Sequence, residues 1–168
     1  FVASGMSYSY LNHALSEMGI VGRLPVLKVG LSYPLDEAIV VEFAERCETI
    51  VVVEERRSFI ERQVVGILHP LKQAGELAVE VYGKEFPGTL AGIGSTGGLN
   101  PSILIERLTA LVRAYAGLPI ELTNGRLTRL VDQIEETANY QVDIAERTPT
   151  FCPGCPHRDS SSVLLELR

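Results

Sequence analysis

The chain has 168 residues, of which 46% are hydrophobic and 21% charged, and its net charge is −6. This composition is typical of an ordinary globular protein with one compact domain and some additional chain. Because affinity for nucleic acid comes mainly from clustered Lys and Arg, the acidic balance argues against a nucleic-acid partner. No apolar run approaches the ~18–20 residues that span a bilayer, and the start lacks the basic segment of a secretory signal. We therefore expect neither nucleic acid nor a membrane as a partner.

The chain starts at Phe1, without Met, directly in an apolar run. We therefore expect a segment cut from a longer protein. Three cysteines in this length do not form a disulfide framework, so a reducing, cytoplasmic location is expected.

Strand-like and helical patterns alternate through the first two thirds of the chain. Residues 1–6 are apolar and strand-like, and residues 8–18 have helical spacing, with Ser7 as the expected N-cap. Ser58 and Asn100 are the expected caps of two later helices, and Pro70 is expected to end the first of these. The remaining expected strands are 26–29, 49–53 and 77–82, and the remaining helices are 35–46, 59–68 and 101 to about 116.

This alternation predicts an α/β fold with three layers, in which a mainly parallel sheet is covered by helices. The character of the chain changes after residue 117. Residues 126–139 are polar and fit either a surface helix or a tether, and residues 143–149 are charged and turn-prone. The sequence thus predicts a domain boundary near residues 145–150, and three parts at residues 1–125, 126–150 and 151–168.

The strongest chemical signal is a pair of cysteines, Cys152 and Cys155, within Cys-Pro-Gly-Cys-Pro-His-Arg. Such a pair can supply half the ligands of an iron–sulfur cluster, or half of a structural zinc site that His157 could join. A dithiol redox site is a third use, but it expects a buried strand just before the motif, and residues 145–150 make a poor strand. Two unligated cysteines in a turn are the fourth interpretation. The third cysteine, Cys47, is expected to be a small, partly buried side chain.

Two further regions are weaker candidates. Residues 92–98 (Gly-Ile-Gly-Ser-Thr-Gly-Gly) resemble an anion-cradling loop, but they lack the ending of a P-loop, and a surface loop is the favoured interpretation. Glu54 and Glu55 follow a strand where α/β sheets place ligands, although an exposed acidic turn or an interface contact is the default. Structural or solvent-facing roles are expected for His13, His69 and Lys28.

One family accounts for these pieces together. The motif at residues 152–158, followed by a Ser-rich helix start at 159–162, resembles the opening of the diphosphate-binding domain in indolepyruvate-type ferredoxin oxidoreductases. The resemblance covers most of the chain and is weakest over residues 83–141. Upstream, the similar segments are residues 1–9, 27–35, 51–55 and 59–61.

The resemblance implies a role for each of the three parts. Residues 1–125 would be a transketolase C-terminal-like domain, residues 126–150 a helical tether or linker, and residues 151–168 the truncated start of a thiamine-diphosphate-binding domain. In relatives the first domain packs between cofactor-binding domains and binds no thiamine. The chain also lacks the Gly-Asp-Gly and Asn-Asn pattern that holds the metal-bound pyrophosphate of thiamine diphosphate. We therefore expect no catalytic residue and no bound cofactor in the isolated segment.

The resemblance also implies the chemistry of the parent enzyme. It would oxidatively decarboxylate a 2-oxoacid such as indolepyruvate on thiamine diphosphate with Mg, pass electrons through an iron–sulfur cluster to ferredoxin, and release an acyl-CoA. Cys152 and Cys155 would be iron–sulfur ligands, although Pro156 stands where relatives often have Gly. The implied partners are other domains or subunits of the oxidoreductase, with a homodimer as one form of assembly. The alternatives are a stand-alone binding or subunit-docking domain and a zinc-stabilised structural module.

Overall fold

The computed structural model describes residues 1–114, 122, 125–143, 145 and 150–167. The chain divides into two units, Phe1–Ala138 and Asn139–Arg168. In the part of the chain that the structure describes, no helix is both long enough and apolar enough to cross a membrane.

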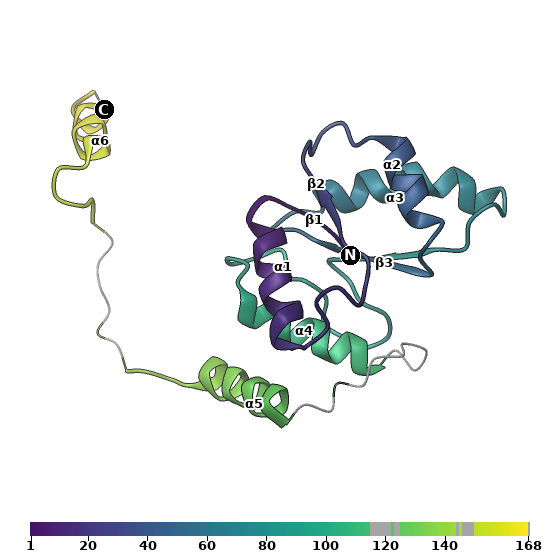
Figure 1. Ribbon diagram of the computed structural model, residues 1–168. Coiled ribbons are helices and arrows are strands. Elements are labelled where there is room, and N and C mark those ends of the chain that lie inside the picture. The colour runs from purple at the N-terminus through teal and green to yellow at the C-terminus, as the bar shows by residue number, and fades with distance from the viewer. Residues whose placement is uncertain (115–121, 123–124, 144, 146–149, 168) are drawn as a thin grey trace. The chain divides into compact units, whose positions relative to one another are not determined.

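The first unit is built on a four-stranded parallel sheet in the order β2-β1-β3-β4 (Figure 1). Its strands are β1 (Val2–Ser4), β2 (Leu27–Val29), β3 (Thr49–Val53) and β4 (Glu80–Tyr82). The longest strand, β3, consists of a threonine and four β-branched aliphatic residues, which suits a strand that is covered on both faces. The central strands are β1 and β3; β2 lies beside β1 at one edge of the sheet, and β4 lies beside β3 at the other edge.

Helices cover both faces of this sheet. On one face lie α1 (Gly5–Glu17) and α4 (Pro101–Ala114), and on the other lie α2 (Glu37–Ala44) and α3 (Phe59–Gln73) (Figure 1). The predicted three-layer α/β fold with a mainly parallel sheet is therefore confirmed.

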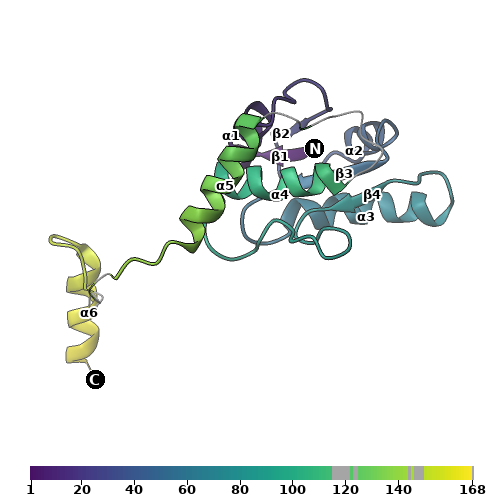
Figure 2. The same cartoon turned by 90° about the horizontal axis from the view of Figure 1, so that it is seen from below.

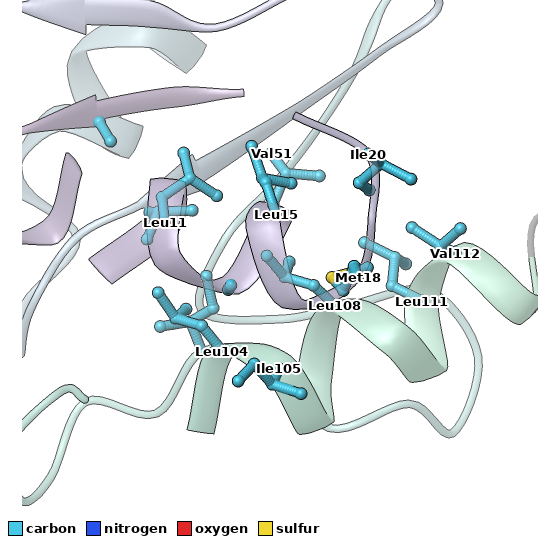
Figure 3. Packing of buried hydrophobic residues seen from close by; sticks show 14 of the residues in the cluster. Leu11, Leu15, Met18, Ile20, Val51, Leu104, Ile105, Leu108, Leu111 and Val112 are labelled. Carbon is cyan, nitrogen blue, oxygen red and sulfur yellow. The ribbon is translucent and has the colours of Figure 1, made fainter. Parts of the chain in front are cut away.

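The alternation of side chains along β3 produces two separate cores. Val51 and Val53 belong to the core with α1 and α4, whereas Ile50 and Val52 belong to the core with α2 and α3. Figure 3 shows how side chains of α1 and α4 interdigitate in the first core. The residues labelled there are Leu11, Leu15, Met18, Ile20, Val51, Leu104, Ile105, Leu108, Leu111 and Val112.

Helix α5 (Gly125–Asn139) joins the first core on the same face as α1 and α4 (Figure 2). Leu127 is fully buried and Val131 nearly so. The Arg126 guanidinium donates a hydrogen bond to the Glu17 carboxylate of α1 at 2.8 Å. Residues 126–139, expected as a helix or a tether, thus form a helix with one buried stripe and an otherwise polar surface.

Two predicted helix limits are wrong. The first helix begins at Gly5 with Ser4 as its N-cap, and Ser7 lies buried inside it. Gly5 has φ of 49°, which lets the chain turn from β1 into the helix without a connecting loop, so the cap lies earlier than the serine pattern suggests.

Pro70 does not end α3, which continues to Gln73. The local cost of a proline in a helix is ~3 kcal/mol, and the burial of Ile60, Val64 and Leu68 against the sheet outweighs it. The helix ends instead at a glycine cap, where Gly75 has φ of 74°.

The second unit contains α6 (Pro156–Glu166). No residue of this helix is buried, and its apolar side chains are exposed. They are Val163, Leu164 and Leu165, and Leu167 directly after the helix is exposed as well.

Candidate functional site

The two cysteines of the motif lie on one tight turn before α6. The Cys155 N–H donates to the Cys152 carbonyl at 3.0 Å, which closes the turn. Pro153 occupies the second position and Gly154 the third, where φ is 77°; proline followed by a positive-φ glycine is the pattern of a type II turn. Cys155 is the N-cap of α6, and Pro156 is its first residue. The sequence Pro-Gly-Cys-Pro therefore fixes both the turn and the helix start.

This turn can present two thiols to a shared ligand. Neither cysteine forms a disulfide; Cys152 is exposed and Cys155 is half-buried. Soft sulfur donors spaced in this way suit an iron–sulfur cluster or zinc, so the donor set fits half of either site. Among the residues with a described position, no three His, Cys, Asp or Glu side chains gather as metal ligands. The other ligands of a complete site would therefore have to come from elsewhere.

The carboxyl edge of the sheet in the first unit is the second candidate region. Glu54, directly after β3, is only 6% exposed. Its carboxylate accepts hydrogen bonds from the N–H groups of Ile60 at 2.8 Å and Glu61 at 3.1 Å, so it caps the first turn of α3. Ser58, the expected cap, makes no side-chain capping bond. The exposed-turn interpretation thus holds for Glu55, which is exposed, and is wrong for Glu54.

Lys84, two residues after β4, connects the segments at this edge. Its ammonium donates to the carbonyl of Glu54 at 2.6 Å and to that of Gly94 at 3.4 Å. Its backbone N–H donates to the Glu61 carboxylate at 3.0 Å. Burial lowers the pKa of Lys84, and the nearby carboxylates of Glu54, Glu61 and Glu55 oppose this shift. Sequence reasoning missed this residue; its position two residues after a strand was the available signal.

The glycine-rich loop is tied to the same edge. A Cβ on Gly92 would lie 2.2 Å from the Lys84 carbonyl oxygen, and one on Gly83 would lie 2.5 Å from the Glu61 carboxylate. Gly92 therefore requires glycine for close backbone approach, whereas a side chain at Gly83 would displace the Glu61 carboxylate. Ile93 is fully buried, and its N–H donates to the Gly83 carbonyl at 2.9 Å. The start of this loop thus packs into the protein, and its neighbours include carboxylates, which disfavour a bound anion.

The remaining candidates have structural or solvent-facing positions. Cys47 is half-buried, as expected, and burial raises the pKa of its thiol. His13 and His69 are exposed. The Lys28 ammonium lies 4.7 Å from the centre of the Tyr8 ring, a cation–π distance.

Comparisons with known proteins place the chain in a family. Residues 1–132 match the family model described as an indolepyruvate oxidoreductase domain. The chain is 34% identical over 157 residues to the indolepyruvate oxidoreductase subunit IorA of Methanothermobacter thermautotrophicus, and 32% identical over 157 residues to that of Methanothermobacter marburgensis. It is 29% identical over 170 residues to the subunit IorA of Archaeoglobus fulgidus.

These alignments cover 94% of this chain for the two Methanothermobacter proteins and 95% for the Archaeoglobus protein, but only 21%, 21% and 22% of the relatives themselves. The chain thus spans about a fifth of the length of the curated relatives it matches. No solved structure matches it significantly. Because the family model covers 132 of the 168 residues, the chain belongs to the indolepyruvate oxidoreductase domain family.

Proposed function

We propose that this chain is a noncatalytic scaffold within an indolepyruvate-oxidoreductase-type subunit. Residues 1–125 form a transketolase C-terminal-like domain that packs between cofactor-binding domains, residues 126–150 connect it to the next domain, and residues 151–168 open the thiamine-diphosphate-binding domain. The observation that carries this proposal is the bonding at the carboxyl edge of the sheet, where the charged groups of Glu54, Glu61 and Lys84 bond to backbone groups of neighbouring segments.

These hydrogen bonds lie at the place where the topology of the sheet would otherwise favour a ligand. In open α/β sheets, ligands bind beyond the carboxyl ends of the strands, at the point where the strand order reverses. In this sheet that point lies between β1 and β3. N–H groups at the start of a helix such as α3 are in general a site for a phosphate. Glu54 already accepts hydrogen bonds from two of them, and its negative charge opposes a second anion. The arrangement therefore stabilises the domain and leaves little basis for binding a diphosphate.

The parent enzyme would oxidatively decarboxylate a 2-oxoacid such as indolepyruvate, with ferredoxin as electron acceptor and acyl-CoA as product. Thiamine diphosphate, held with Mg by another part of the protein, would supply the electron sink for loss of CO₂. The names of the relatives, which describe subunits of an indolepyruvate oxidoreductase, support this reaction class. Other domains and subunits, and a second copy in a homodimer, would be the partners, in the cytoplasm.

Cys152 and Cys155 would hold one side of an iron–sulfur cluster in this parent enzyme. The support is the turn itself, which places two free cysteines three positions apart at the start of a helix. The exposed apolar side chains of α6 also suit a helix that the rest of a cofactor domain would cover.

The test is iron, acid-labile sulfide and visible absorption of the parent subunit, expressed anaerobically. A variant with Cys152→Ser and Cys155→Ser should lose the iron and sulfide of one cluster. The matched control, Cys47→Ser, should retain them because Cys47 is half-buried and packs against the core of the first unit, outside the motif. Unchanged iron and sulfide in the double variant would remove the cluster assignment.

A zinc-stabilised module is the second candidate, because the same turn suits zinc equally well. Zinc that is present without sulfide, and is lost in the double variant, would favour it.

A further inference from the structure

An exposed apolar face lies at the carboxyl end of the sheet, beside the edge strand β2. It consists of Leu31 and Tyr33 from the loop after β2, Ile39 from α2 and Phe59 from the start of α3. Their exposed fractions are 69%, 68%, 49% and 52%. Single exposed apolar residues are common, but a group gathered from three segments is typical of an interaction surface.

The loop that carries this face is held in place by α3. The Gln63 side chain donates to the Ser32 carbonyl at 3.0 Å and accepts from the Leu35 N–H at 3.2 Å. The rings of Tyr33 and Phe59 lie 6.0 Å apart between centroids, a distance typical of aromatic pairs. Because the loop is already ordered, a partner that binds it loses less conformational entropy.

A hollow of about 490 Å³ adjoins the face and is mainly apolar. The two charged residues that line it are both engaged elsewhere. The Asp36 carboxylate accepts from the Ile39 N–H at 3.2 Å and caps α2, and the Lys28 ammonium lies over the Tyr8 ring. The charged groups at the hollow are thus poorly placed to orient a polar small molecule, whereas apolar side chains of a protein would fit. Its apolar lining includes Leu27, Val29, Leu31, Pro34, Leu35 and Ile39.

We propose that this face docks against another domain of the same parent subunit, an inference that rests on the proposed scaffold function. The matched relatives are about five times as long as the region aligned with this chain, so a subunit of that type contains ample further chain to cover the face. Four exposed side chains, of which Leu31 and Ile39 line the hollow, also make a small surface, whereas a stable complex of separate proteins buries ~800 Å² on each partner. A small surface suits a tethered domain, since the covalent connection raises its effective concentration.

Photo-crosslinking of the full-length parent subunit tests this proposal. The photoreactive residue p-benzoylphenylalanine replaces Tyr33 in one variant and Leu31 in a second, since both side chains are exposed and their replacement leaves the core intact. The control carries it in place of Glu76, which is exposed in the turn after α3, at the other end of that helix. A thermal unfolding temperature equal to that of the wild type establishes that each variant is folded.

The expected product is a crosslink within one chain, at the mass of a single subunit, from Tyr33 and Leu31 to a peptide outside residues 1–168. Its yield should be ~10-fold above that of the Glu76 control, because a tethered partner stays close to its site. A product of twice the mass would assign the face to a second copy, and a product with a different subunit would assign it to that subunit. Either product, or a yield equal to the control, would overturn the proposal. The cluster analysis of the Cys152 and Cys155 variants is independent of this result, so the scaffold function and the docking face can fail separately.

Discussion

The Lys84 ammonium donates a hydrogen bond to the backbone carbonyl of Glu54 at 2.6 Å, which ties the end of β4 to the end of β3. Glu54 in turn caps α3 through its carboxylate. One glutamate thus connects two strands and a helix at the edge of the sheet where related architectures place ligands.

Replacing Glu54 by alanine should destabilise the fold. Glu54→Ala leaves the N–H groups of Ile60 and Glu61 without their acceptor, and loss of a helix cap or a buried hydrogen-bond partner costs ~1–3 kcal/mol. Glu55→Ala is the matched control, because Glu55 is exposed and such changes stay within about 0.5 kcal/mol. Urea unfolding of the two variants and the wild type measures the difference. Equal midpoints for both variants would contradict the capping role.

Lys84 should make stability depend on pH in the alkaline range. Burial lowers its pKa below the ordinary lysine value of 10.5. At pH values between the lowered pKa and 10.5, the unfolded chain binds more protons at this lysine than the folded chain does. The contribution of Lys84 to the free energy of unfolding therefore increases as the pH rises through this window. The difference in unfolding free energy between wild type and Lys84→Met should therefore shift in favour of wild type as the pH approaches 10.5. Urea unfolding at several pH values measures it, and a difference that stays constant would argue against a buried ammonium.

The cysteines should differ in reactivity. Cys152 is exposed, whereas Cys47 is half-buried and burial raises the pKa of its thiol; because the thiolate is the nucleophile, Cys47 should react more slowly. The measurement is iodoacetamide labelling of the metal-free chain near neutral pH, followed by mass spectrometry of the separate peptides. In 8 M urea, about the concentration that unfolds small domains, the two rates should converge. Faster labelling of Cys47 in the folded chain would contradict its half-buried position against the core.

Several of these features could be predicted from the sequence, because they depend on local patterns. The apolar run Thr49–Val53 gave the correct strand, and Asn100 is the cap of α4, where its side chain accepts from the Ile103 N–H at 3.1 Å. The turn between the two cysteines follows from Pro153 and Gly154 in the same way. These residues interact only with near neighbours in the chain, so propensity and spacing determine them.

The carboxyl edge of the sheet could not be predicted in the same way. Glu54 caps a helix that begins five residues later, and Lys84 contacts a carbonyl thirty positions away. The Lys84 contact exists only once the parallel strands have brought these segments together, and the Glu54 cap comes from a residue four positions before Ser58, where the local pattern predicts the cap. Pro70 illustrates the same limit, since the packing of α3 on the sheet outweighs a local rule.

Replacing Thr109 by valine should leave stability unchanged or raise it slightly. Thr109 is 1% exposed on α4, and within the described structure its hydroxyl lacks a hydrogen-bond partner. Burying an unsatisfied hydroxyl costs ~1–3 kcal/mol, and valine has nearly the same shape without this cost. Leu108→Ala, one position earlier and fully buried, should instead lose ~2–5 kcal/mol. Urea unfolding compares the two, and a loss with Thr109→Val as large as that with Leu108→Ala would indicate that the hydroxyl has a partner.

Thiamine diphosphate with Mg should not bind tightly to the 168-residue chain. The N–H groups at the start of α3 that could hold a phosphate already bind the Glu54 carboxylate, and Glu54, Glu55 and Glu61 surround the neighbouring Lys84 ammonium. A diphosphate at this edge would have to displace a buried carboxylate and then remain close to its charge. Calorimetric titration of the isolated chain measures this, with the full-length parent subunit as the control that should bind. Submicromolar binding to the isolated chain would contradict the scaffold function and locate a cofactor site within these residues.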